Sequence, residues 1–297
     1  MFESIGFIGL GMMGLPMSKH LLDAGYNVVA YDVDPEACSK AKANGANIAS
    51  SPREVAERGN PVITILPNSE IVEDVVFGDE GVMAGAAEGS VLIEMTTAYP
   101  MSTLKIAKEL EKKSMLMLDA PVSGGVVGAE KGTLSIIVGG DQDLFDQCMP
   151  LFEIMGKNIF YMGAVGSGHT MKAVNNFLSG CSMVATSEAV ALATKAGLDP
   201  KRVVDVLQVS TGRSYSTEWK FPRFVLTRQF DDGFRIELFN KDLDILTRLG
   251  RELKVPMFTA NMIHQIFSFA LSQGYGPKGH TSIAQLIEEW ADVKMEE

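Results

Sequence analysis

The stretch Ile5-Gly6-Phe7-Ile8-Gly9-Leu10-Gly11-Met12-Met13-Gly14 joins a short apolar run to three glycines with the spacing GxGxxG. A helical pattern of apolar residues follows as far as Leu22, and a second apolar run over residues 27–31 ends at Asp32. A strand, a glycine turn, a helix and a second strand closed by an acidic residue occur in this order in dinucleotide-binding βαβ units. The stretch therefore predicts such a unit; a strand–helix unit that binds no nucleotide is the alternative.

Each glycine of the turn has its own predicted task. Gly9 makes the tight turn, Gly11 lets the backbone approach a pyrophosphate, and Gly14 lets the helix pack closely against the strand. The first N–H groups of the helix offer donors and the positive end of the helix dipole to the phosphates. We therefore expect the cofactor-binding turn to consist of Gly9, Leu10, Gly11, Met12, Met13 and Gly14.

Asp32 closes the second strand, where its carboxylate would accept hydrogen bonds from the 2′- and 3′-hydroxyls of a ribose. The same charge would repel a 2′-phosphate, and no arginine or lysine follows before Lys40. The sequence therefore favours NAD over NADP. A plain turn aspartate is the lesser alternative.

Strand patterns recur over residues 62–66, 91–95, 115–119 and 134–138, with helical stretches between most of them. Such alternation predicts an α/β domain with a mostly parallel, doubly wound sheet of the Rossmann type and helices on both faces. Ligands bind beyond the carboxyl ends of the strands in such sheets. The residues expected at those ends are Pro67, Asn68, Thr96, Thr97, Ser123, Gly124 and Gly125.

Ser123-Gly124-Gly125 has the composition of an anion-binding turn. Two glycines free the backbone to point successive N–H groups at one anion, and the serine adds a hydroxyl. A substrate carboxylate is the simplest ligand, and a plain glycine turn is the alternative.

A glycine-rich entry at residues 166–168 leads into a long, mostly apolar run that reaches Ala196 and predicts a buried helix. Lys172 and Asn176 share one face of this helix. A lysine in an apolar helix is costly unless it is paired or used, although its stem can also lie on the surface with its amine in water.

The second part of the chain lacks clear strand patterns. Helical stretches cover residues 200–209, 241–253, 257–274 and 282–294, and residues 221–234 look like a connecting segment. We therefore expect a Rossmann-type domain over residues 1–164 and an all-α domain over residues 165–297, joined by a helix over about residues 166–196.

The composition restricts the classes of function. A net charge of −11 without a basic cluster argues against nucleic acid, and no apolar run looks long enough to span a membrane. Four histidines without metal-ligand spacing argue against a metal. Three scattered cysteines and an N-terminus without a basic region before its apolar stretch indicate the cytoplasm, or the mitochondrial matrix after removal of a presequence.

Four motifs occur in a fixed order: residues 7–17, residues 119–125, residues 166–176 and Lys241-Asp242-Leu243. Together they resemble the β-hydroxyacid dehydrogenase family, which includes 3-hydroxyisobutyrate dehydrogenase, 2-(hydroxymethyl)glutarate dehydrogenase and tartronate semialdehyde reductase. The resemblance runs from end to end. It implies a long interdomain helix and a helical domain that helps to form homodimers or homotetramers.

The resemblance also implies roles for single residues. Lys172 would be the catalytic acid/base, and Asn176 would hold the substrate and the lysine. Ser123 and Gly124, with Gly125 beside them, would bind the substrate carboxylate. The further cofactor contacts would be Leu66, Pro67, Thr97 and Lys241, whereas Ile71 stands near where some members have a cofactor-binding asparagine.

The expected reaction is the NAD-dependent oxidation of a small 3-hydroxy acid, most simply 3-hydroxyisobutyrate, to its semialdehyde. A free lysine has a pKa of about 10.4, and burial beside the cofactor would lower it toward the working pH. The alternatives are 2-(hydroxymethyl)glutarate or tartronate semialdehyde as substrate, and a non-catalytic nucleotide-binding scaffold. A sugar-phosphate decarboxylating enzyme would need a basic pocket near Lys172, and the sequence shows no such cluster.

Overall fold

The computed structural model describes residues 2–296. The chain divides into two compact units, Met1–Lys172 and Ala173–Glu297, and the division falls inside helix α9 (Ser167–Lys195). The predicted domain boundary at residues 164–165 lies just before this helix. Each unit is described below by itself.

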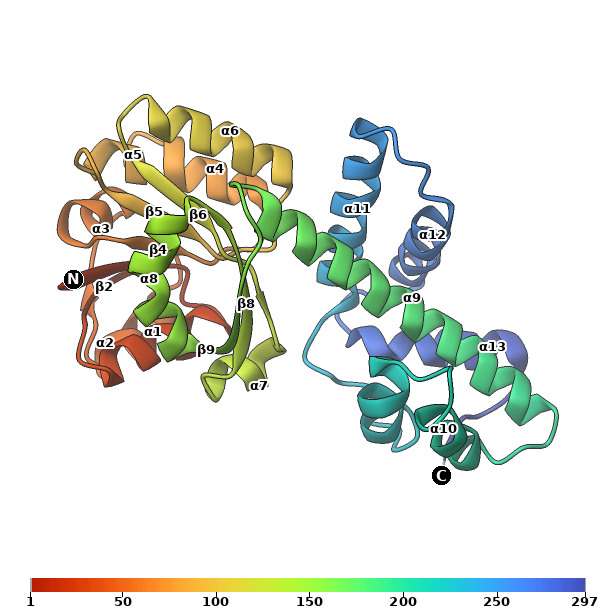
Figure 1. The fold of residues 1–297 in the computed structure, drawn as a ribbon. Helices are drawn as coiled ribbons and strands as arrows, with labels where there is room; N and C mark the ends of the chain where they lie inside the picture. The colour runs from red at the N-terminus through yellow and green to blue at the C-terminus, as the bar shows by residue number, and fades with distance from the viewer. Residues whose placement is uncertain (1, 297) are drawn as a thin grey trace. The chain divides into compact units, whose positions relative to one another are not determined.

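The first unit is built on a mixed, mostly parallel sheet (Figure 1). Its strands β1 to β6 run parallel, β8 is antiparallel to β6, β7 is antiparallel to β8, and β9 is parallel to β8. The order across the sheet is β3 (Asn47–Ile48), β2 (Asn27–Tyr31), β1 (Ser4–Ile8), β4 (Val62–Thr64), β5 (Val91–Glu94), β6 (Leu116–Asp119), β8 (Leu134–Gly140) and β7 (Val122–Ser123), with β9 (Gly156–Tyr161) beside β8.

The six predicted strands are present, and the doubly wound architecture is confirmed. Three strands were not predicted. β3 and β7 have only two residues each, and β9 is mostly exposed, so none of them carries a clear apolar pattern.

Alternating side chains of the sheet feed two separate cores. Ile5 and Phe7 of β1 point to the face covered by α1 (Gly14–Asp23), α2 (Pro35–Ala43), α7 (Gly125–Glu130) and α8 (Gln142–Met155). Ile8 points to the other face, covered by α3 (Pro52–Arg58), α4 (Ser69–Phe77), α5 (Val82–Gly85) and α6 (Pro100–Glu111). This arrangement directs the carboxyl ends of β1, β4, β5 and β6 to one edge of the sheet.

The second unit is helical, and no strand occurs over residues 173–296. Its elements after α9 are α10 (Pro200–Gln208), the π-helix η1 (Ser216–Val225), α11 (Ile236–Glu252), α12 (Phe258–Ser272), the 3-10 turn η2 (His280–Ser282) and α13 (Ile283–Ala291). Residues 221–225 are therefore helical where the start of a connecting segment was predicted. α11 begins at Ile236, five residues before the predicted start, so that Lys241 lies in its second turn.

α9 has 29 residues and is long and apolar enough to cross a membrane by length and composition, contrary to our expectation that no run is long enough. The core helix of a water-soluble protein passes the same test. Met183, Val184 and Val190 of α9 are buried in the core of the second unit together with Phe239 and Phe267, which is how a core helix behaves.

Candidate active site

The glycine turn between β1 and α1 has the geometry that the fingerprint demands. Gly9 has φ +98°, and a Cβ atom there would stand 2.2 Å from the carbonyl oxygen of Ile65. A Cβ atom at Gly14 would stand 1.9 Å from the carbonyl oxygen of Gly9. Gly11 differs, because a Cβ atom there would meet nothing within 4 Å. The first and third glycines are therefore required by packing, and the second leaves open space beside the backbone.

The start of α1 suits an anion. No side chain caps the helix at Met13, so no side-chain acceptor competes for the first-turn N–H groups. Met12 is 57% exposed and Leu10 is buried, so the turn offers its outer backbone to a ligand and anchors its inner side. The residues present therefore fit the pyrophosphate of a dinucleotide.

Asp32 links the end of β2 to the glycine turn. Its Oδ2 accepts a hydrogen bond from the N–H of Leu10 at 2.6 Å, and its Oδ1 accepts one from the N–H of Asp34 at 2.8 Å. A carboxylate has about four acceptor positions, so two remain for ribose hydroxyls. The backbone bonds fix the orientation of the carboxylate before any ligand arrives.

The ends of β4 and β5 lie beside the glycine turn. A Cβ atom at Gly9 would stand 3.2 Å from Cδ2 of Leu66, and the N–H of Leu66 donates to Oγ1 of Thr96 at 2.9 Å. Pro67 is exposed and Thr97 is half-buried, both at the same edge of the sheet. The structure thus places Leu66 against the predicted cofactor turn, and Pro67 and Thr97 follow the neighbouring strands β4 and β5.

The segment Ser123–Gly125 leads from β7 into α7. Gly124 has φ +132° and Gly125 has φ +62°, and both are exposed while Ser123 is half-buried. Two successive residues with positive φ form a backbone conformation that ordinary side chains rarely adopt, and glycine turns of this kind can present N–H groups to an anion. The segment can therefore present backbone donors to an anion.

Lys172 is only 7% exposed and Asn176 only 3% exposed, one turn apart on α9. The solvated alternative for Lys172 is therefore wrong. Within the second unit, Nδ2 of Asn176 donates to Oδ2 of Asp242 at 2.7 Å, and Nζ of Lys241 lies 3.3 Å from Oδ1 of the same carboxylate. Asp242 orients the amide of Asn176 and holds the partly exposed Lys241.

Asp242 was not predicted from the sequence as a site residue. A signal was present, because Phe239, Asp242, Leu243 and Leu246 fall on one face of α11 and all are buried. A carboxylate in the apolar stripe of an amphipathic helix needs a partner.

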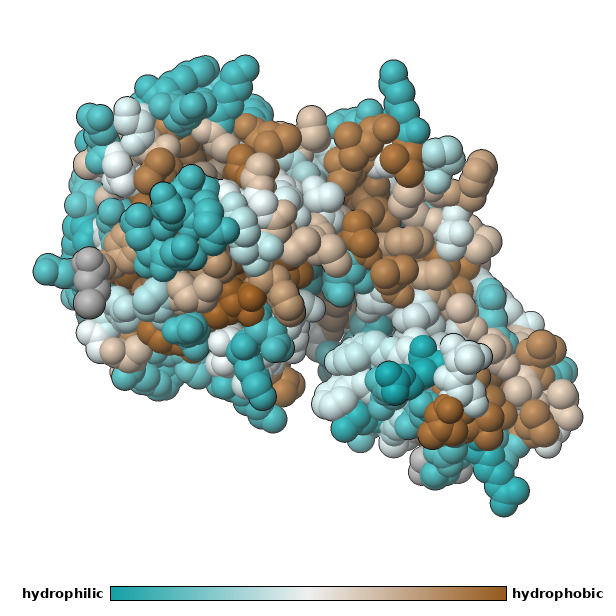
Figure 2. All heavy atoms as spheres, viewed as in Figure 1, coloured by the Kyte–Doolittle hydropathy of each residue, from teal (hydrophilic) through white to brown (hydrophobic). Residues whose placement is uncertain are grey.

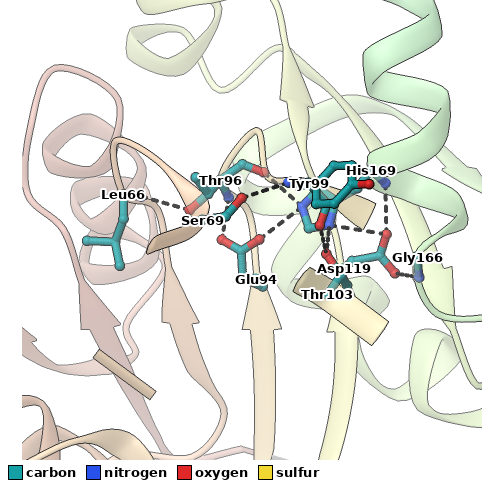
Figure 3. Close-up of polar contacts among 9 residues, drawn as sticks. All are labelled: Leu66, Ser69, Glu94, Thr96, Tyr99, Thr103, Asp119, Gly166 and His169. Carbon is teal, nitrogen blue, oxygen red and sulfur yellow. Dashed lines mark hydrogen bonds and ion pairs between the residues drawn. The ribbon is translucent and has the colours of Figure 1, made fainter. Parts of the chain in front are cut away.

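A second group was missed in the first unit (Figure 3). Around the carboxyl ends of β5 and β6, a buried polar network, here called the His169 cluster, connects Glu94, Thr96, Thr103, Asp119 and His169. All five are at most 1% exposed. Over residues 2–296 no group of three or more histidine, cysteine, aspartate or glutamate side chains is arranged to hold a metal ion, so this network is a hydrogen-bonded one.

Comparison with known proteins agrees with this geometry. Residues 4–163 match the family model described as the NAD binding domain of 6-phosphogluconate dehydrogenase. Residues 166–287 match the family model described as the NAD-binding of NADP-dependent 3-hydroxyisobutyrate dehydrogenase.

Two relatives are similar over nearly their whole length. The mitochondrial 3-hydroxyisobutyrate dehydrogenase of Mus musculus is 39% identical over 291 residues, covering 96% of this chain and 87% of the mouse protein. The 2-(hydroxymethyl)glutarate dehydrogenase of Eubacterium barkeri is 38% identical over 291 residues, covering 98% of this chain and 97% of that protein. Among solved structures, 3-hydroxyisobutyrate dehydrogenase of Mycobacterium tuberculosis with L-serine has a TM-score of 0.90 and 31% identity, covering 97% of this chain and 99% of that one.

Proposed function

Since the chain belongs to the β-hydroxyacid dehydrogenase family, we propose that it oxidises 3-hydroxyisobutyrate to methylmalonate semialdehyde with NAD, and that Lys172 is the acid/base. The family membership makes the chain an NAD(P)-dependent oxidoreductase that acts on 3-hydroxy acids. The choice of substrate, the preference for NAD and the roles of single residues are our proposals.

The observation that carries the proposal is the buried amine of Lys172 one turn from the buried amide of Asn176. Burying an ammonium is costly, and a protein that only binds a nucleotide gains nothing from it. The family model over residues 166–287 and the relative from Mus musculus both bear the name of 3-hydroxyisobutyrate dehydrogenase. This combination favours an enzyme over a non-catalytic scaffold.

A bound dinucleotide supplies the hydride acceptor for the carbinol carbon. Residues 9–14 would hold its pyrophosphate, Asp32 its adenosine ribose, and Leu66, Pro67, Thr97 and Lys241 would contact the rest. The Asp32 carboxylate, fixed by two backbone N–H groups, favours two ribose hydroxyls over a 2′-phosphate, which supports NAD over NADP.

The protein residues handle the proton and the position of the substrate. The neutral amine of Lys172 takes the hydroxyl proton as the C–H bond gives up its hydride, and the resulting ammonium returns the proton when the semialdehyde is reduced. Ser123, Gly124 and Gly125 bind the carboxylate. Asn176, oriented by Asp242, holds the hydroxyl side of the substrate. These substrate-binding residues contribute to the rate by positioning the substrate.

The substrate is tested by steady-state rates with 3-hydroxyisobutyrate, 2-(hydroxymethyl)glutarate, glycerate as the reduced form of tartronate semialdehyde, and L-serine, each with NAD and with NADP. We expect the highest kcat/KM for 3-hydroxyisobutyrate with NAD. A higher value for 2-(hydroxymethyl)glutarate would assign the second candidate, which the similarity to the Eubacterium barkeri relative supports nearly as well. No NADH formation with any 3-hydroxy acid would favour the scaffold.

The role of Lys172 is tested with Lys172→Ala. Loss of a general acid/base lowers kcat by about 10²–10⁴-fold, while the Kd for NADH should stay near that of the wild type. Lys19→Ala is the matched control, because Lys19 is an exposed lysine of the same unit that pairs with Asp23 on the surface. Wild-type turnover in Lys172→Ala would remove the proposed role.

We also infer a homo-oligomer. Large apolar side chains are exposed along α12 and just before it, among them Val255 at 51%, Phe258 at 86% and Met262 at 58%. Figure 2 shows apolar residues gathered over the part of the second unit that contains α11 and α12. An exposed apolar patch of this kind supports an interface between copies of the chain. Light scattering would measure the mass, and a monomer at micromolar concentration would contradict the inference.

The three free cysteines support a reducing compartment, the cytoplasm or the mitochondrial matrix.

A further inference from the structure

Two buried carboxylates lie side by side at the edge of the sheet that holds the cofactor turn. Glu94 ends β5 and Asp119 ends β6, and the two residues are direct partners in the parallel register. They are 1% and 0% exposed. Like charges on neighbouring strands repel, and burial removes the water that would screen them. A hydrogen-bond donor or positive group between them reduces this repulsion.

His169 supplies that group from the first turn of α9 (Figure 3). Its Nε2 lies 2.8 Å from the carbonyl oxygen of Thr96 and 2.9 Å from Oε2 of Glu94. Its Nδ1 lies 2.8 Å from Oγ1 of Thr103 and 3.6 Å from Oδ2 of Asp119. The imidazole thus stands between the two carboxylates and is itself only 1% exposed.

The partners of the ring constrain the protons that it carries. Nε2 faces the carbonyl oxygen of Thr96, which can only accept, so Nε2 is the donor of that bond. In the bond between Nδ1 and Oγ1 of Thr103, Nδ1 accepts when the ring is neutral and donates when the ring is an imidazolium; in the second case Oγ1 can turn its own proton to the carbonyl oxygen of Tyr99, 3.3 Å away. Burial by itself would lower the pKa of His169, but Glu94 and then Asp119 outweigh burial and raise it.

The same cluster anchors the start of α9. Oδ1 of Asp119 accepts from the N–H of Gly166 at 2.6 Å, and Oδ2 accepts from the N–H of His169 at 2.8 Å. A Cβ atom at Gly168 would stand 2.4 Å from the carbonyl oxygen of Ile137, so only glycine permits this approach of the helix to the sheet. The first turn of α9 is therefore held by backbone donors, by close packing and by the ring of His169.

We propose that His169 is a positioning residue for Lys172: held between Glu94 and Asp119, its ring fixes the first turn of α9 and thereby the place of the amine. His169 and Lys172 are three residues apart on the helix, where side chains are neighbours on one face. The inference rests on the proposed role of Lys172 as acid/base. It adds a residue whose effect on the reaction passes through the backbone of α9.

The cluster also reaches the cofactor side of the sheet edge. The N–H of Thr96 donates to Oε1 of Glu94 at 2.8 Å, and Oγ1 of Thr96 accepts from the N–H of Leu66 at 2.9 Å. One hydrogen-bonded network therefore connects the predicted cofactor contact at Leu66 with the turn that precedes Lys172. A shift of His169 should change the distance between reacting groups more than it changes the affinity for the cofactor.

The test compares His169→Leu, His169→Gln and Glu94→Gln with the wild type and with Lys172→Ala. The measurements are kcat, KM, the Kd for NADH, the pH profile of kcat and the melting temperature. Leucine removes both hydrogen bonds of the ring. Glutamine keeps an amide donor and acceptor at the same place. Glu94→Gln keeps the shape of the cluster and removes one carboxylate.

We expect His169→Leu to lower kcat on the order of 10²-fold, the effect of misplacing a catalytic group by about 1 Å, with the Kd for NADH within about twofold. The limb of the pH profile that disappears in Lys172→Ala should move in His169→Leu. His169→Gln should recover most of kcat. A residue that serves stability alone would lower the melting temperature and leave the kcat and pH profile of the folded enzyme unchanged.

Wild-type kcat and an unmoved pH limb in folded His169→Leu, with Lys172→Ala inactive, would overturn this inference and leave the proposed function intact. Wild-type turnover in Lys172→Ala would instead overturn the proposed function. If His169→Leu does not fold, Glu94→Gln decides by the same readouts: a moved limb with reduced kcat supports the positioning role, and an unmoved limb with wild-type kcat refutes it.

Discussion

Replacing Gly14 with alanine and, separately, Gly11 with alanine should separate the folding role of the glycine turn from its binding role. At Gly14 the new methyl group would stand 1.9 Å from the carbonyl oxygen of Gly9 and 3.0 Å from Cγ2 of Ile65. A backbone atom cannot rotate away as a flexible side chain can, so β1 and α1 must move apart. At Gly11 the methyl group meets nothing within 4 Å, and this glycine does not have the positive φ that penalises alanine.

The two variants differ in which measurement they change. Overpacking costs about 1–3 kcal/mol, so Gly14→Ala should unfold at a temperature about 2–12 °C lower than the wild type. Gly11→Ala should keep its melting temperature within about 1 °C in the absence of ligand. Its methyl group occupies the space of the pyrophosphate, and the same 1–3 kcal/mol then appears as a Kd for NADH about 5–150-fold weaker.

Thermal unfolding without ligand and fluorescence titration with NADH measure both quantities on the same samples. Each variant is the control for the other, since both add one methyl group to the same turn. Unfolding of Gly11→Ala at as low a temperature as Gly14→Ala would show that the space beside Gly11 is not open. Wild-type affinity of Gly11→Ala for NADH would show that the dinucleotide lies elsewhere.

Three further predictions concern charged and polar groups. Asp32→Ala should raise the ratio of NADP to NAD affinity and weaken NAD by about 1.5–3 kcal/mol, the value of hydrogen bonds to a charged group; an unchanged cofactor ratio in isothermal titration would contradict our interpretation of this carboxylate. Burial lowers the pKa of Lys220 to about 8, so the unfolded chain holds more protons than the folded chain between about pH 8 and 10.5. The free energy of unfolding should therefore rise by about 3 kcal/mol over this pH range. Lys220→Met should remove this rise in urea titrations, and equal pH slopes in both proteins would show that the amine is not desolvated. Asn176→Ala removes the amide that donates to buried Asp242 and should cost about 1–3 kcal/mol of stability as well as turnover, whereas wild-type urea midpoints would show that this hydrogen bond has no net value.

The sequence predicts most of the first unit because its signals are local. The glycine turn can be predicted from its spacing because contacts a few ångströms away require glycine at positions 9 and 14. The central strands can be predicted because both their faces are buried and their sequences are therefore apolar. β9 was not predicted, because most of its residues are exposed and it lacks an apolar pattern. Lys172 also stands out in the sequence, because it interrupts an apolar helix. The sequence alone did not show whether its amine is buried or reaches water.

The His169 cluster was not predicted because each of its residues is ordinary when it is considered alone. Glu94 at the end of an apolar strand resembles a residue entering a loop, Asp119 resembles another, and His169 resembles a lone histidine after a glycine turn. The register of β5 and β6 makes Glu94 and Asp119 direct neighbours and buries both. The two acids therefore need a partner that reduces their repulsion, which neither residue reveals by itself. Asp119 shows the cost, since burial raises its pKa and the charge of His169 opposes that rise. Two acids at the ends of adjacent parallel strands therefore predict a donor or cationic partner in the next segment that returns to the same edge of the sheet, and in this chain that segment is the first turn of α9.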